Sequence, residues 1–132
     1  MQLTDQDRHI MIEHHLTKAS KMLIEGDEML ALQHFDMACN RYYYACFHAV
    51  HALLLFNHLS AKMHEGLLSV FGKEFILTGK IDRQYGSFLT RMEQLRKKAD
   101  YNCVYDVTAQ EVETMQQPVH QLLQTIQTLL TN

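Results

Sequence analysis

The most informative segment of the chain is residues 40–55, which read NRYYYACFHAVHALLL. Its aromatic and aliphatic side chains would cover most of the circumference of an α-helix, and a helix of that kind lies at the centre of a bundle. The surrounding stretch from Asp27 to Asn57 contains no Gly or Pro. We therefore expect one long central helix over residues 27–57, about 45 Å long at about 1.5 Å per residue and capped by Asp27.

The segments on either side repeat with the period of amphipathic helices. A helix capped at Thr4 is expected to end at Gly26, because glycine commonly terminates helices. Further helices are expected over residues 62–76, 82–101 and 109–130. Pro118 is expected to kink the last of them or to weaken its first turns. No strand-like alternation is found, so the sequence predicts one all-α domain over residues 1–132, a five-helix up-and-down bundle.

The composition agrees with a folded, soluble chain. Of its 132 residues 47% are hydrophobic and 20% are charged, and no apolar run approaches the roughly 20 residues that span a bilayer. The N-terminus resembles no secretory signal. Cys39 and Cys46 would lie about 10 Å apart on one helix, too far for a disulfide. Reduced thiols, a cytoplasmic location and no membrane association are expected.

Charge is distributed unevenly along the chain, although the net charge is only −3. Residues 73–98 contain seven Lys or Arg against three acids, whereas residues 99–132 contain four acids and no Lys or Arg. A local positive field of this size suits a phosphate-bearing ligand such as a nucleotide or RNA. An ordinary solvated helix face is the alternative interpretation.

Two polar residues interrupt the apolar central helix. Arg41 and His48 are seven residues apart and so share one face. A buried guanidinium needs a partner or a cleft. Arg41 is therefore either an anchor to a neighbouring helix, with His48 a satisfied core histidine, or a phosphate clamp with His48 as donor or base.

Metal and cofactor sites are not expected. The pairs His48 and His51, and His14 and His15, have no acid or Cys beside them at zinc-site spacing. Nothing in the chain resembles a phosphate-binding glycine loop or a paired-thiol motif.

The end of the fourth predicted helix gathers a second polar group. Arg96 and Asp100 are four residues apart and can form an ordinary surface ion pair. Tyr101 follows directly. Three further candidate binding residues lie near this end of the helix: Lys97 and Lys98 just before it, and Tyr105 just after it.

Three segments together resemble the HEPN family, and more narrowly its small stand-alone prokaryotic members. Residues 40–55 resemble the signature NRxYYAxFHAxxALL, and two further segments agree with the family in order and spacing: His64-Glu65-Gly66 followed by residues 71–75, and Leu95 to Tyr101. The resemblance covers about residues 8–128.

The resemblance implies a helical bundle, usually a homodimer, that is often paired genetically with a small nucleotidyltransferase. Many HEPN proteins are metal-independent ribonuclease toxins with an Arg-x4–6-His motif on the fourth helix. In this chain Arg96 stands at that place, with Tyr101 where the histidine is expected. A phenol is a poor base at neutral pH, so His48 or His64 would have to supply the base. The resemblance also implies that Tyr101 or Tyr105 is a candidate for attachment of a nucleotide by the partner.

Three hypotheses follow from these residues. The chain is a module of a toxin–antitoxin or defence system that binds nucleotide or RNA and acts with a nucleotidyltransferase, using Arg41, His64, Lys97, Lys98, Asp100 and Tyr105. Alternatively, it is a metal-independent ribonuclease with Arg96, Tyr101 and His48 as catalytic residues. In the third hypothesis it is a helical dimer whose aromatic and arginine side chains only hold the interface.

Overall fold

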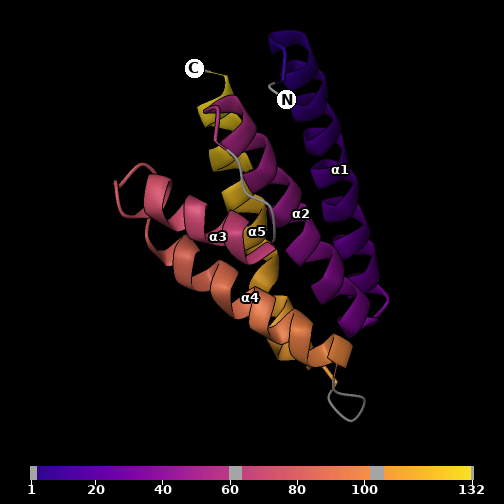
Figure 1. Cartoon of the computed structure of the whole chain (residues 1–132). Helices are drawn as coiled ribbons and strands as arrows, with labels where there is room; N and C mark the ends of the chain where they lie inside the picture. The colour runs from indigo at the N-terminus through magenta and orange to yellow at the C-terminus, as the bar shows by residue number, and fades with distance from the viewer. Residues whose placement is uncertain (1–2, 60–63, 102–105, 132) are drawn as a thin grey trace.

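The structure, a computed structural model, describes residues 3–59, 64–101 and 106–131, apart from the side chains of His64 and Glu65. Within these ranges the chain forms α-helices and no strand (Figure 1). The helices are α1 (Asp5–Ala31), α2 (Phe35–Phe56), α3 (His64–Phe71), α4 (Gln84–Tyr101) and α5 (Ala109–Leu130), and a π-helical turn at Gly72–Ile76 extends α3. The predicted all-α, five-helix bundle is confirmed.

Helix α2 lies at the centre of the bundle, as predicted. Twelve of its 22 residues are buried, and α1, α3, α4 and α5 all pack on it (Figure 1). The fully buried side chains Tyr42, Tyr43, Leu53 and Leu54 supply much of the core. In the described part of the chain, no helix combines the length and apolarity needed to cross a bilayer.

The predicted boundary between the first two helices is wrong. Helix α1 continues through Gly26 to Ala31 and, with 27 residues, is longer than α2. It ends where Gln33 adopts a left-handed conformation with φ of 64°. The amide of His34 then donates to the Met29 carbonyl at 2.9 Å, and that of Gln33 to the Leu30 carbonyl at 3.0 Å. These two bonds form a Schellman motif without glycine, so the sequence offers no conventional stop signal at this position.

Gly26 instead allows close contact between α1 and α2. It is buried within α1, and a Cβ atom at this position would lie 2.7 Å from two carbon atoms of the Tyr42 ring. The hydroxyl of Tyr42 donates to the Asp27 carboxylate at 2.6 Å.

Asp27 also connects α1 to α5. It accepts hydrogen bonds from the Gln116 amide at 3.0 Å and from His120 Nε2 at 2.9 Å. Burial alone would raise the pKa of Asp27, but the hydrogen bonds from Tyr42, Gln116 and His120 outweigh it and hold that pKa below its ordinary value. The charged carboxylate therefore stabilises the junction of three helices.

Two cysteines lie inside α2. Cys39 and Cys46 are buried free thiols, as predicted. Burial, together with nearby acids, raises the pKa of Cys39 to about 12, and burial also raises that of Cys46. Neither thiol is therefore reactive in the folded state.

Candidate functional site

The fourth helix directs its central arginine into the protein. The side chain of Arg96 is only 9% exposed, and its Nη1 donates to Asp100 Oδ2 at 3.0 Å. Its guanidinium carbon lies 4.9 Å from the centroid of the Tyr43 ring and 5.7 Å from that of Tyr44. Such cation–π contacts stabilise a charge that has lost much of its water.

Burial tends to lower the pKa of Arg96, but Tyr44, Tyr43 and Asp100 together raise it above its ordinary value. The guanidinium therefore stays charged. Its Nε is buried and has no hydrogen-bond partner among the residues that the structure describes. A positive charge is thus held in place at the interface of α2 and α4.

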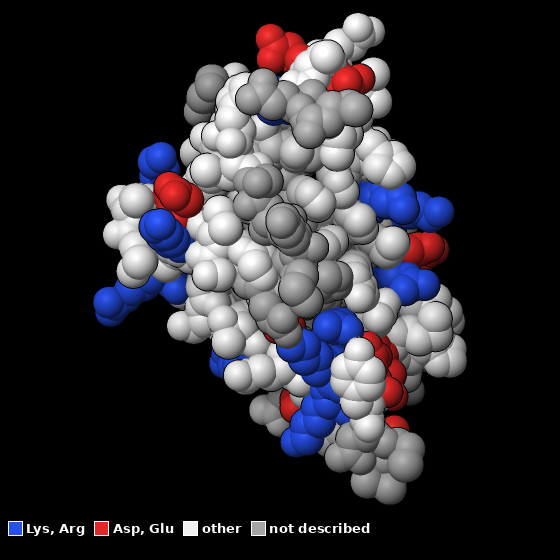
Figure 2. Space-filling model, viewed as in Figure 1, with Lys and Arg blue, Asp and Glu red and all other residues white. Residues whose placement is uncertain are grey.

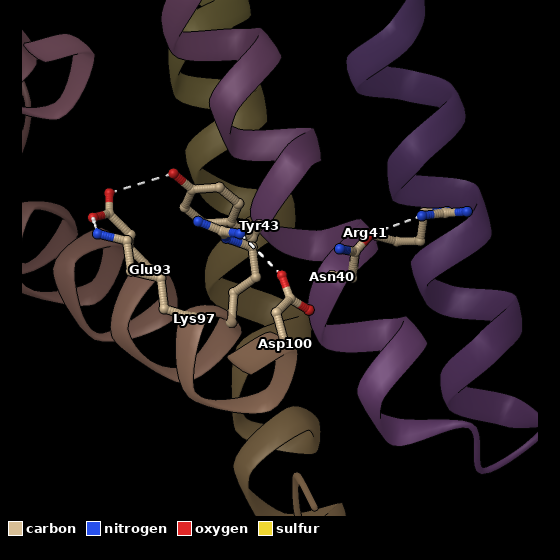
Figure 3. A network of polar contacts seen from close by, with 7 residues as sticks. Asn40, Arg41, Tyr43, Glu93, Lys97 and Asp100 are labelled. Atoms are coloured by element: carbon tan, nitrogen blue, oxygen red, sulfur yellow. Dashed lines mark hydrogen bonds and ion pairs between the residues drawn. The ribbon is translucent and has the colours of Figure 1, made fainter. Parts of the chain in front are cut away.

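One turn earlier on α4, Glu93 forms a second part of the same network. This carboxylate is buried; it pairs with Lys97 Nζ at 3.1 Å and accepts a hydrogen bond from Tyr43 Oη at 3.4 Å. Burial, followed by the Glu93 charge, raises the pKa of Tyr43. Figure 3 shows Glu93, Tyr43 and Asp100 gathered between α2 and α4. Along one face of α4, two acids therefore flank two cations, in the order Glu93, Arg96, Lys97 and Asp100.

The outer edge of this network is open to solvent. Tyr101 is 81% exposed at the end of α4, and Lys98 is exposed beside it. The Asp100 side chain is 41% exposed. Figure 2 shows Lys and Arg side chains gathered over the C-terminal half of α4. Arg96 faces α2, whereas Lys98 and Tyr101 are exposed on other faces of the same end of α4.

Arg41 does not belong to this network. Its Nε pairs with Glu25 of α1 at 3.1 Å, and its Nη1 donates to Asn40 Oδ1 at 2.7 Å. Figure 3 shows Arg41 directed toward α1, away from Asp100 and Tyr43. Of the two interpretations of Arg41, the anchor between neighbouring helices agrees with these contacts.

His48 faces α1 and joins a histidine cluster. Its Nδ1 lies 3.0 Å from Nδ1 of His15, and the ring of His15 stacks on that of His51 with centroids 4.1 Å apart. His48 does not reach Arg96 directly, because the rings of Tyr44 and Phe47 lie between them in a chain of contacts. No group of three metal-binding side chains is found within the described ranges.

His15 is the most strongly perturbed member of the cluster. Burial, and then the neighbouring charges of His51, His48, His14 and Lys18, lower its pKa to about 4. His15 is therefore neutral at pH 7, and burial also lowers the pKa of His51.

Two predicted site residues cannot be placed. The side chain of His64 and the whole of Tyr105 lie outside the described residues. Conversely, Tyr43, Tyr44 and Glu93 belong to the site although the sequence did not predict them as site residues. The four-residue spacing of Glu93 and Lys97 could have predicted their ion pair, since residues four apart on a helix are neighbours.

These features define a class of protein: a helical bundle in which an arginine of the fourth helix packs on two tyrosines of the central helix. The model of the HEPN domain matches residues 12–129, so the chain belongs to the HEPN family.

The chain is similar to several named relatives. The "UPF0332 protein" of Thermotoga maritima is 32% identical over 124 residues, which cover 94% of each chain. In Methanocaldococcus jannaschii, the protein named "Putative toxin MJ0142" is 32% identical over 102 residues, covering 77% of this chain and 69% of the relative. A second protein of that organism, "Putative toxin MJ0605", is 45% identical over 64 residues, 48% of each chain.

Proposed function

We propose that this chain is a toxin-like HEPN protein that binds phosphate groups of a nucleotide or RNA at the C-terminal half of α4. The observation that carries the proposal is the set of charged and aromatic side chains on this half of α4: the buried Arg96, held by Asp100 and the two tyrosines, and the exposed Lys98 and Tyr101 on other faces of the helix. Guanidinium and ammonium groups bind phosphate, and an exposed ring offers a stacking surface for a base. Two relatives whose printed names contain the word toxin agree with this role.

Ribonuclease chemistry is the second candidate, because Arg96 occupies the place of the family's catalytic arginine. Cleavage without a metal needs a base for the 2′-hydroxyl as well as a cation for the developing phosphorane charge. Among the described histidines none contacts Arg96, since His48 pairs with His15. A base would have to come from a second copy or from a residue outside the described ranges. Binding therefore fits the geometry better than cleavage.

Fluorescence anisotropy with a labelled ten-nucleotide RNA tests binding, and the same RNA on a gel in EDTA tests cleavage. We expect salt-dependent binding and intact RNA.

Lys98→Gln should weaken binding and reduce the slope of log K against log salt by about one, as loss of one phosphate contact does. The matched control is Lys21→Gln, which removes the same charge from the exposed face of α1. If both variants bind like the wild type, the α4 site is wrong. Discrete products that vanish in Arg96→Ala would favour the ribonuclease.

We also propose that the chain forms a homodimer and acts with a nucleotidyltransferase partner. The family membership supports both ideas. Native mass spectrometry of the purified chain tests the first, with a mass of twice 15.4 kDa as the expected result. Co-purification of the chain with a nucleotidyltransferase encoded beside it tests the partnership. After incubation of the two with ATP, the mass of the peptide that contains Tyr101 shows whether a nucleotide has been attached.

A further inference from the structure

A groove of about 900 Å³ lies between the first half of α4 and α3 with its π-helical extension. Its apolar lining consists of Leu68, Phe71, Ile76 and Leu89. Phe71 and Leu89 are buried, whereas Leu68 and Ile76 are partly exposed. Arg96 and its partners do not line this groove, so it is a surface separate from the network described above.

The π-helical turn forms one wall of the groove. The amide of Leu77 donates to the carbonyl of Gly72, five residues earlier, at 2.9 Å. Such turns are rare within helices and occur frequently at functional sites. Gly72 lines the groove, and nothing lies within 4 Å of the place that its Cβ would take. Leu77, directly after the turn, is 83% exposed. This wall therefore offers a partner both free space and exposed apolar surface.

Two arginines flank the apolar lining. Arg83, just before α4, and Arg91, within it, both line the groove and are exposed. In the described part of the chain, neither side chain forms an ion pair or a hydrogen bond. Asp82 is the one acid among the described lining residues, and it accepts a hydrogen bond from the Gln84 amide at 2.9 Å. Figure 2 shows Lys and Arg side chains gathered at the edge of the molecule where α3 is joined to α4.

We propose that this groove is the docking site for an acidic, amphipathic helix of a partner protein. Apolar side chains of the partner helix enter the groove, and two of its carboxylates pair with Arg83 and Arg91. These arginines are eight residues apart, which is about 12 Å along a helix at about 1.5 Å per residue. The carboxylates are therefore expected seven or eight residues apart. The proposal goes beyond the proposed function, because it concerns other residues and a protein ligand.

A helix fits this groove better than the other classes of macromolecule. Two neighbouring helices form the groove, and the side-chain ridges of a third helix can pack between them. An extended peptide would need the edge of a strand, and the described residues form none. RNA would meet the cations but no exposed ring on which a base could stack, because Phe71, the one aromatic residue of the described lining, is buried.

Selection from a phage library of helix-forming peptides, with the wild-type chain as bait, tests the chemistry of the occupant. We expect enrichment of peptides with apolar residues three and four apart on one face and with Asp or Glu seven or eight apart beside them. No enrichment, or enrichment of basic or extended sequences, would overturn the proposal.

Charge variants test the two ion pairs with an enriched peptide and its Glu→Gln counterpart. Arg83→Gln and Arg91→Gln should each weaken binding of the acidic peptide by about twofold to fivefold, the range of an exposed ion pair. Neither should affect the Glu→Gln peptide. The matched control Lys21→Gln removes a charge from α1 and should bind like the wild type. Equal binding of the acidic peptide by all three variants and the wild type would contradict the pairing.

Gly72→Phe tests the groove itself, because the added ring extends into the space that the partner's apolar side chains would fill. It should weaken binding by more than about tenfold, since buried apolar anchors carry most of the energy of an interface. Ser69→Phe adds the same ring at an exposed position of α3 outside the groove and should bind like the wild type. Far-UV circular dichroism checks both folds, and if Gly72→Phe does not fold, the arginine variants decide. Unchanged binding in a folded Gly72→Phe would refute the site.

The same variant distinguishes the other occupants. Gly72→Phe should bind RNA like the wild type and keep its mass in native mass spectrometry. If it loses RNA binding, the groove is a nucleic-acid surface, and if it turns a dimer into a monomer, the occupant is a second copy; either result makes the proposal wrong. If the wild type binds no RNA, the proposed function fails, whereas the peptide selection still decides the groove.

Discussion

The ring of Tyr42 occupies the space in which any side chain at position 26 would begin. A Cβ atom on Gly26 would lie 2.7 Å from Cδ1 and Cε1 of that ring. The ring cannot move aside easily, because it is fully buried and its hydroxyl is held by Asp27 at 2.6 Å. The contact between α1 and α2 therefore depends on the absence of a side chain at this point.

Gly26→Ala should lower the free energy of unfolding by up to about 2 kcal/mol. Overpacking costs about 1–3 kcal/mol, and alanine returns about 1 kcal/mol in a helix interior. Urea unfolding followed by circular dichroism measures the change. Gly72→Ala is the control, since nothing lies within 4 Å of a Cβ there, and it should leave stability unchanged or raise it. Equal effects of the two substitutions would contradict the close packing.

Gln33→Gly should stabilise the protein by about 1 kcal/mol. Gln33 has φ of 64° at the end of α1, and a left-handed backbone costs about 1–2 kcal/mol for a residue with a Cβ. Gln33→Val should instead destabilise it, because a branched Cβ fits this conformation worst. Thermal unfolding of both variants shows whether each substitution raises or lowers the stability. A stabilising Val and a destabilising Gly would show that this turn is formed differently.

Stability should fall as the pH decreases from 6.5 to 4. The pKa of folded His15 is about 4, mainly because of burial and then of the charges of His51, His48, His14 and Lys18. The unfolded chain, with an ordinary histidine pKa near 6.5, therefore binds a proton in this window that the folded chain does not. Since His15 is only half-buried, the loss is on the order of 1–2 kcal/mol rather than the full shift.

His15→Gln should flatten this part of the stability profile, measured by urea unfolding at pH 7, 5.5 and 4. His9→Gln, an exposed substitution on the same helix, should leave the profile as it is. A wild type whose stability stays constant between pH 7 and 4 would refute the lowered pKa of His15.

Arg96→Met and Arg41→Met should differ in their effects on stability and on RNA binding, although both residues are predicted site arginines. Arg96→Met removes a desolvated cation–π contact and should lower the free energy of unfolding by about 2 kcal/mol. It should also abolish RNA binding. Arg41→Met breaks the partly exposed pair with Glu25 and the hydrogen bond to Asn40, so it should cost less than about 1 kcal/mol and leave RNA binding intact. Loss of binding in Arg41→Met would restore Arg41 as a phosphate clamp.

Most of the fold could be predicted because the relevant signals are local. The ring-rich residues 42–47 predict the central helix, and the stripe of Val112, Val119 and Ile126 predicts α5. The end of α1 could not be predicted, because a glutamine forms its left-handed turn and because Gly26 serves packing instead of termination.

The site was predicted only in part. The sequence places Arg96 and Asp100 one turn apart, and the structure pairs them. Which helix Arg41 and His48 face depends on the rotation of α2, and both face α1, where Glu25 and His15 lie. That rotation is set by tertiary packing of Tyr42 and Tyr43, a long-range effect that helical periodicity does not contain.

The rate at which the enclosed thiols of Cys39 and Cys46 are modified reports how often the helical bundle opens. A labelling reagent can modify them only while α2 is undocked. The third cysteine of the chain, Cys103, lies outside the described residues, so it is replaced by serine, and the modification rate then reports how often the bundle opens. A ligand that closes the bundle more firmly would slow that rate, and its affinity could be read from the delay without any probe being attached to the ligand.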